Sequence, residues 1–120
     1  MKKFVKSFTI NEKKWGRATE REAVLGVLRA EDTGKQCCLG VYLTACGYTD
    51  ESLNGERNHP KSVPNSYAFW SSVWPKKKDL YVDAVRDLAT INDAKMKLPA
   101  RKKAIIEGFK KLGVKVTFKK

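Results

Sequence analysis

The stretch GKQCCLGVYLTACG, residues 34–47, decides the fold of this 120-residue chain. From its first cysteine onward it is apolar on nearly every side, and Cys38, Tyr42 and Cys46 follow one another at the four-residue spacing of a helix. A helix that is apolar all round belongs in the protein interior rather than on its surface. The stretch therefore predicts a buried central helix over residues 37–46.

Working outward, apolar stripes and capping residues predict three more helices. Thr19 and Glu22 form a capping-box pattern, Asp79 is a candidate N-cap, and Pro99 suits a first helical turn. The expected helices cover residues 19–28, 80–90 and 99–112, and alternating apolar residues predict strands at 4–10 and 114–118.

The two predicted strands lie at opposite ends of the chain, and each needs a partner. Each other is the simplest choice, because helices that cover one face can stabilise a two-stranded sheet. The alternative is a homodimer completed through a sheet edge. The expected fold is α+β: about four helices packed on a small sheet formed by the N- and C-terminal strands, within a single domain over residues 1–120.

An irregular, aromatic-rich loop is expected at residues 48–78, where prolines and an Asn-Gly pair break any long element. Aromatic side chains are enriched in protein–protein interfaces, and three lysines follow directly. The alternative is that the aromatic residues fold back over the core. The interface candidates are Tyr67, Trp70, Trp74, Lys76, Lys77 and Lys78.

Positive charge is concentrated at the two ends of the chain. The net charge is +12, of which residues 1–21 carry +5 and residues 95–120 carry +9, while the segment between them is slightly acidic. Pairing of the terminal strands would gather these charges into a surface that attracts anions, with a lysine-rich solubilising surface as the alternative. The expected anion-binding residues are Arg101, Lys102, Lys103, Lys110, Lys111 and Lys115.

The cysteines and the single histidine do not predict a reaction. Cys37, Cys38 and Cys46 have no zinc-site spacing, and no nucleophile and base are paired in the sequence. The thiols are expected to be reduced core residues of a cytoplasmic protein, and no apolar run is long enough to cross a membrane. We therefore expect no catalytic residues, no metal and no cofactor.

Three segments together carry a resemblance to a family. GKQCCLG at 34–40, LATIND at 88–93 and FKKLGVKVTF at 109–118 resemble small uncharacterised proteins of tailed bacteriophages and prophages. The resemblance covers most of the chain in that order, but not the middle loop. It implies structural roles for the segments' glycines and cysteines and for Asn92 and Asp93, and no functional residue is carried over.

The function expected from charge and resemblance is that of a non-enzymatic phage accessory protein. It would bind and neutralise or redirect a host defence or regulatory component in the bacterial cytoplasm, through an anionic ligand that is a nucleic acid, a nucleotide signal or an acidic protein face. The first alternative is a protein–protein inhibitor that acts through the aromatic loop. The second is a small enzyme whose site is not visible in the sequence.

Overall fold

The computed structural model describes residues 4–17, 27–57, 60–61, 69 and 78–120, with the backbone alone for 78–83. Within these residues the chain forms two strands and four helices. In chain order they are β1 (Ser7–Asn11), α1 (Cys38–Ala45), α2 (Asp50–Leu53), α4 (Lys78–Asp93), α5 (Leu98–Lys111) and β2 (Lys115–Lys119).

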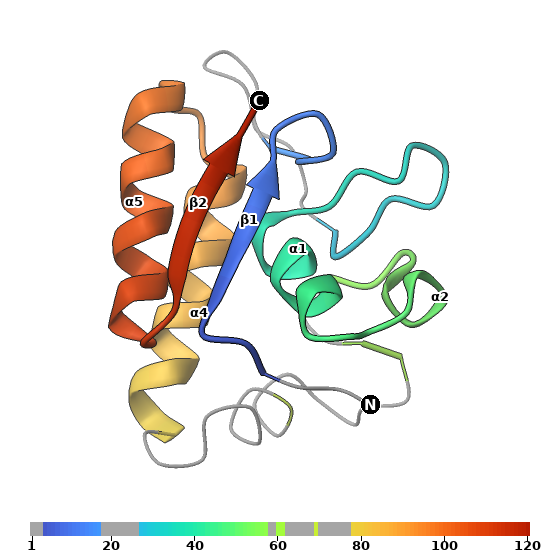
Figure 1. The fold of residues 1–120 in the computed structure, drawn as a ribbon, viewed down its shortest axis with the longest axis horizontal. Coiled ribbons are helices and arrows are strands. Elements are labelled where there is room, and N and C mark those ends of the chain that lie inside the picture. Colours follow the sequence, from blue (N-terminus) through green and yellow to red (C-terminus); the bar gives the residue numbers. More distant parts are fainter. Residues whose placement is uncertain (1–3, 18–26, 58–59, 62–68, 70–77) are drawn as a thin grey trace.

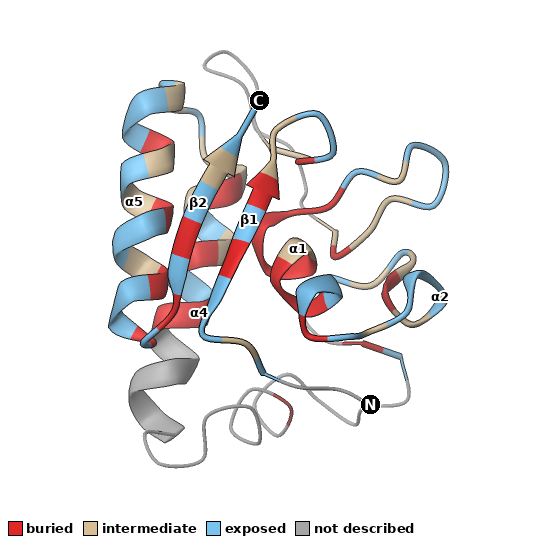
Figure 2. Ribbon diagram, viewed as in Figure 1, coloured by how far each residue is buried: buried red, intermediate tan, exposed pale blue. Residues whose placement is uncertain are grey.

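The first and last strands pair with each other, as the sequence predicted, and the α+β fold is confirmed. They run parallel, with Ser7 opposite Lys115 and Asn11 opposite Lys119 (Figure 1). Side chains alternate across the strands: Phe8, Ile10 and Val116 are buried, while Ser7, Thr9, Lys115 and Thr117 are exposed (Figure 2). One face of the sheet covers the core, and the other presents hydroxyl and lysine side chains.

Helices cover the inner face of the sheet. Helix α5 packs against both β2 and α4, and α1 contacts both β1 and α4. In Figure 1, α5 and α1 lie on opposite flanks of the strand pair, with α4 behind it. Parallel strands need a long crossover connection, and here the helical part of the chain supplies it.

Helix α1 is buried as predicted, because its apolar side chains meet the sheet and α5. The rings of Phe8, Tyr42 and Phe109 form one aromatic cluster with centroids 5.0–5.5 Å apart. Leu39 and Leu43 are also buried. Burial of these large apolar side chains is the main stabilising contribution to the fold.

Several expected boundaries were wrong. Helix α4 begins at Lys78, so Asp79 lies inside its first turn instead of capping it. The helix expected at 19–28 falls largely outside the described residues, and residues 27–30 are not helical. Leu28 is nevertheless fully buried. Phe4 is 36% exposed and precedes β1, so it does not share the buried face of that strand.

Candidate functional site

A hollow of about 310 Å³ lies between α5 and β2. Its floor is aliphatic, from Ile106, Val114 and Val116, and Gly113 lies at its edge. Its rim is formed by the side chains of Lys6, Lys110 and Lys115, which come from the segment before β1, the end of α5 and the start of β2.

Two backbone features bring these three segments together. The Lys6 carbonyl oxygen accepts a hydrogen bond of 2.8 Å from the Lys115 N–H, which joins the start of β2 to the segment before β1. Gly113, at φ 78°, turns the chain sharply after α5, and the Val114 N–H donates back to the Phe109 carbonyl. A left-handed residue after a helix is a common way to end it.

The hollow combines unpaired positive charge with exposed apolar surface. Lys6, Lys110 and Lys115 are all exposed, and none of them forms an ion pair with an acidic residue in the described part of the chain. Ile106 is 39% exposed and adds apolar surface beside these charges. The arrangement attracts negative charge and offers a place for one apolar group.

The structure divides the six residues predicted to bind an anion. Lys110 and Lys115 line the hollow. Lys103 is exposed and lies seven residues before Lys110, on the same outward side of α5. Lys111 lies on the other flank of the helix, in a groove toward α4 that also contains Asp87 and Glu107, so its charge is partly balanced.

The prediction for Arg101 was wrong, because this side chain is fully buried. Its guanidinium donates to the carbonyl oxygens of Ile91, Asn92, Ala94 and Met96, at 2.5, 2.9, 2.6 and 3.1 Å respectively. These carbonyls lie at and beyond the end of α4, where backbone acceptors lack helical partners. Burial lowers the pKa of Arg101, and its role is to close the end of α4.

The prediction for Lys102 also needs correction. Its ammonium group lies 3.0 Å from a carboxylate oxygen of Glu12 and 5.5 Å from the ring centre of Phe118. Both groups of the ion pair are largely shielded from water, at 24% and 14% side-chain exposure. Lys102 therefore fastens α5 to the strand pair and is not available to an external anion.

The aromatic loop is only partly described. Tyr67, Trp70, Trp74, Lys76 and Lys77 lie outside the described residues, and for Lys78 only the backbone is described, as the first residue of α4. The interface prediction for this loop therefore stays a prediction. Within the loop, Phe69 is buried and packs edge-on against Tyr48, with ring centres 5.7 Å apart.

The three cysteines are buried and form no disulfide. Burial raises the pKa of the Cys37 thiol to about 11 and also raises the pKa of the Cys38 thiol, so both are protonated at neutral pH. A protonated thiol is a poor nucleophile and a poor metal ligand. Among the described residues, no three His, Cys, Asp or Glu side chains are grouped to hold a metal ion.

The segments 34–40 and 88–93 meet inside the protein at Asn92, which is fully buried. Its side-chain oxygen accepts hydrogen bonds from Trp15 Nε1 at 2.8 Å and from the Cys38 N–H at 3.1 Å, and its amide nitrogen donates to the Gly16 carbonyl at 2.9 Å. Asn92 therefore joins the end of α4 to the start of α1 and to the loop after β1. We call this set of four residues the Asn92 junction.

The chain was compared with models of protein families, with curated proteins and with solved structures, and none of them matches. Across the ranges that the structure describes, no helix combines the length and the apolar character needed to cross a bilayer. Assignment of a function therefore depends on the surfaces of this molecule.

Proposed function

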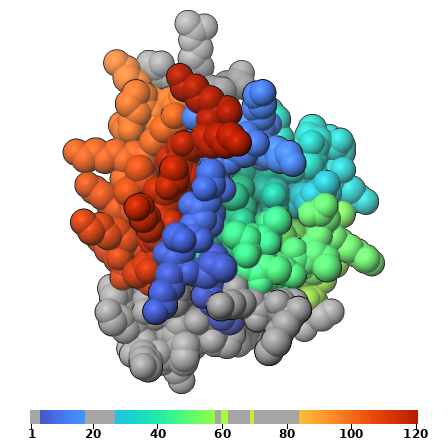
Figure 3. All heavy atoms as spheres, viewed as in Figure 1, coloured from blue at the N-terminus to red at the C-terminus, as the bar shows by residue number. Residues whose placement is uncertain are grey.

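We propose that the chain is a non-enzymatic binding protein that holds an acidic polypeptide at the hollow between α5 and β2. The observation that carries this proposal is the convergence of Lys6, Lys110 and Lys115, without acidic partners among the described residues, around an aliphatic floor. The strands β1 and β2 and the helix α5 lie side by side on the face seen in Figure 3. An acidic segment with one bulky apolar side chain complements such a surface in both charge and shape.

The floor favours a polypeptide over a nucleic acid. Proteins that bind single strands usually stack bases on aromatic side chains, and none of the described residues that line this hollow is aromatic. Its lysines are flexible point charges, which suit irregularly placed carboxylates better than the paired contacts that arginine makes with a base. The aliphatic side chains of Ile106 and Val116 instead suit a leucine- or phenylalanine-like anchor.

The biological setting of the proposal comes from the resemblance to small phage proteins. The acidic partner would be a component of host defence or regulation that the protein neutralises or redirects in the bacterial cytoplasm. The free thiols support a reducing compartment. Binding of an acidic face by a compact basic domain requires no catalytic group and no cofactor.

Charge reversal at the rim tests the proposal. The variant Lys6→Glu/Lys110→Glu/Lys115→Glu should lose affinity for the host partner by more than about tenfold at low salt, and the gap should narrow as salt rises. The partner is first isolated from host lysate with the wild-type protein, then purified for titration by calorimetry. The matched control is Lys35→Glu/Lys61→Glu/Lys95→Glu, and these three lysines are exposed and lie outside the hollow. The control protein has the same net charge as the rim variant.

Three results would contradict the proposal. The control could lose as much affinity as the rim variant, which would indicate a general effect of net charge. Capture could disappear after nuclease treatment, which would point to nucleic acid. Finally, the rim variant could keep full affinity while Trp70→Ala and Trp74→Ala lose it, which would support the aromatic loop as the interface.

A further inference from the structure

A second cavity, of about 530 Å³, lies on the other side of β1 from the lysine-rimmed hollow. It is lined by β1, Lys14, α1, the start of α2 and the segment 29–36, and eight of its eleven described lining residues have polar side chains. The polar side chains that line it are Thr9, Asn11, Lys14, Arg29, Thr33, Gln36, Thr44 and Asp50.

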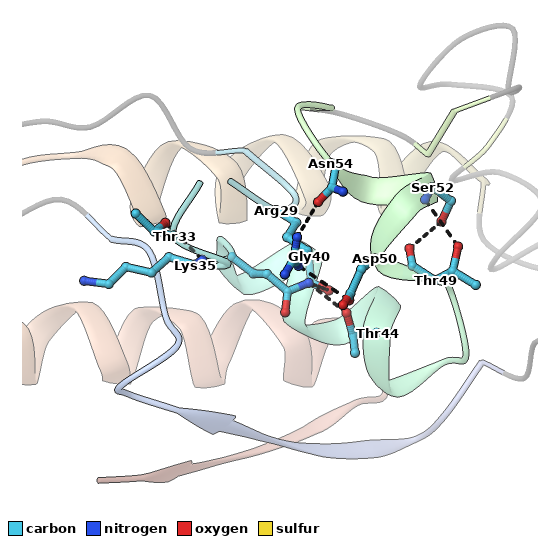
Figure 4. Close-up of polar contacts among 10 residues, drawn as sticks. Arg29, Thr33, Lys35, Gly40, Thr44, Thr49, Asp50, Ser52 and Asn54 are labelled. Carbon is cyan, nitrogen blue, oxygen red and sulfur yellow. Dashed lines mark hydrogen bonds and ion pairs between the residues drawn. The ribbon is translucent and has the colours of Figure 1, made fainter. Parts of the chain in front are cut away.

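Arg29 lines this cavity, and Figure 4 shows its contacts with Asp50 and Asn54. Its Nε lies 3.5 Å from a carboxylate oxygen of Asp50, and Nη1 donates to the side-chain oxygen of Asn54 at 2.5 Å. Nη2 has no acceptor among the described residues and lies beside Gly34, where a Cβ would come within 3.2 Å of it. Gly34 also has φ +74°, so a side chain there would be disfavoured both by backbone strain and by its close approach to Arg29.

Gln36 supplies an unused acceptor from a buried position. The residue is only 8% exposed, and its amide nitrogen donates to the Gly40 carbonyl at 3.1 Å and to the Thr44 hydroxyl at 2.7 Å. Both amide hydrogens are therefore engaged, which also fixes the orientation of the amide. The Gln36 Oε1 atom receives no hydrogen bond from the described residues, yet it is not among their fully buried unpaired atoms, so it is accessible from the cavity.

Hydroxyl groups add donors around the same space. The Thr44 hydroxyl oxygen accepts from Gln36, and the Thr33 hydroxyl oxygen accepts from the Lys35 N–H at 3.2 Å, so the hydrogen of each hydroxyl remains available. Lys14 contributes a second positive charge. Among the described residues of the lining, Asp50 alone is acidic, and it is engaged by Arg29.

We propose that this cavity binds a small phosphate ester that carries hydroxyl groups. The phosphate lies between Arg29 and Lys14, because a dianionic group with three acceptor oxygens matches two cations and neighbouring hydroxyl donors. A ligand hydroxyl donates to Gln36 Oε1, which receives no hydrogen bond from the described residues. The volume lies within the range common for small-molecule sites.

Calorimetric titration of the full chain with ribose 5-phosphate and with AMP tests this site, with ribose and adenosine as the unphosphorylated controls. Both phosphorylated compounds should bind with a dissociation constant below about 1 mM, and their unphosphorylated counterparts should bind at least about tenfold more weakly. The proposal would be overturned if one or both of the phosphorylated compounds did not bind in this range. It would also be overturned if ribose bound as tightly as ribose 5-phosphate.

Two variants locate the binding within the cavity. Lys14→Ala should weaken ribose 5-phosphate binding by about fivefold or more, whereas its exposed neighbour Lys13, which does not line the cavity, should tolerate Ala with less than about a twofold change. Thr44→Val removes a hydroxyl at an exposed helical position and should also weaken binding. Equal losses in Lys13→Ala and Lys14→Ala would indicate nonspecific attraction and reject the site. The triple charge reversal at the hollow between α5 and β2 tests the proposed function separately from this site, because none of the three reversed lysines lines this cavity.

Discussion

The Asn92 junction and the hollow between α5 and β2 differ in how far their polar groups are paired and buried. At the junction, the side-chain oxygen and nitrogen of Asn92 are both hydrogen-bonded, and no part of the residue reaches water. At the hollow, three lysines have no acidic partner among the described residues, and Ile106 is exposed. The segments 34–40 and 88–93 meet at the junction, which holds the fold together. The lysines and the exposed isoleucine at the hollow are the basis of the proposed function.

The largest effect is expected from a single methyl group at Gly40, next to the Asn92 junction. A Cβ at this position would lie 1.9 Å from the carbonyl oxygen of Leu28, which is a backbone atom and cannot swing away. Gly40→Ala should therefore lower the free energy of unfolding by about 4 kcal/mol or more, or prevent cooperative folding. Urea unfolding followed by circular dichroism measures the change.

Gly55→Ala is the matched control for this variant. Gly55 has φ +75°, but a Cβ there would meet no atom within 4 Å. Its substitution should lower stability by only about 1 kcal/mol, from backbone strain alone. A Gly40→Ala protein as stable as Gly55→Ala would show that α1 and Leu28 are not packed this closely.

A smaller loss is expected when the Asn92 junction loses its central side chain. Asn92→Ala removes the acceptor for the Trp15 indole and for the Cys38 N–H, and both donors would stay buried without a partner. We expect a loss of about 3 kcal/mol, because leaving buried donors unsatisfied is more costly than losing an exposed hydrogen bond. Chemical denaturation at neutral pH measures the difference.

Asn11→Ala provides the comparison, because the Asn11 side chain makes, among the described residues, a single local hydrogen bond, which it accepts from the exposed Lys13 N–H at 3.0 Å. Its loss should be under about 1 kcal/mol. Similar values for the two asparagine variants would mean that the Asn92 junction is not a special contributor to stability.

The sequence predicted the parts of this fold that follow from periodicity. The central helix, the helix after Pro99 and both terminal strands were found from apolar spacing, and the pairing of the strands from their need for a partner. The parallel direction was not predicted, because it depends on how the intervening chain crosses the molecule. The Asn92 junction was anticipated only as a structural role for its motif, since its partners lie more than 50 residues away.

The sequence itself contained a sign that Arg101 would be buried and not available to bind an anion. Arg101, Ile105 and Phe109 are four residues apart, so the arginine stands on the apolar stripe of its own helix. A charge in such a position is expected to be buried and hydrogen-bonded, and the structure shows that it is.

By contrast, the cavity around Gln36 brings together side chains from five separate segments, and no local pattern in the sequence indicates it.

Apart from the two control variants, the smallest predicted effect concerns Cys37, at the start of α1, and appears only at alkaline pH. Burial raises the pKa of this thiol from its ordinary value of 9.0 to about 11, so the unfolded chain releases the proton at a lower pH than the folded chain does. Stability is therefore complete below about pH 9 and falls as the pH rises toward 11. At about pH 10.5 the wild type should lose about 2 kcal/mol more than Cys37→Ala does, each relative to its own value at neutral pH. Urea unfolding of both proteins in the presence of a reductant measures this difference. Titration of the lysines affects both proteins alike, so it does not contribute to the difference between them. Parallel loss in the two proteins would mean that the Cys37 thiol reaches water, and the interpretation of the cysteines as inert core residues would then fail at this position.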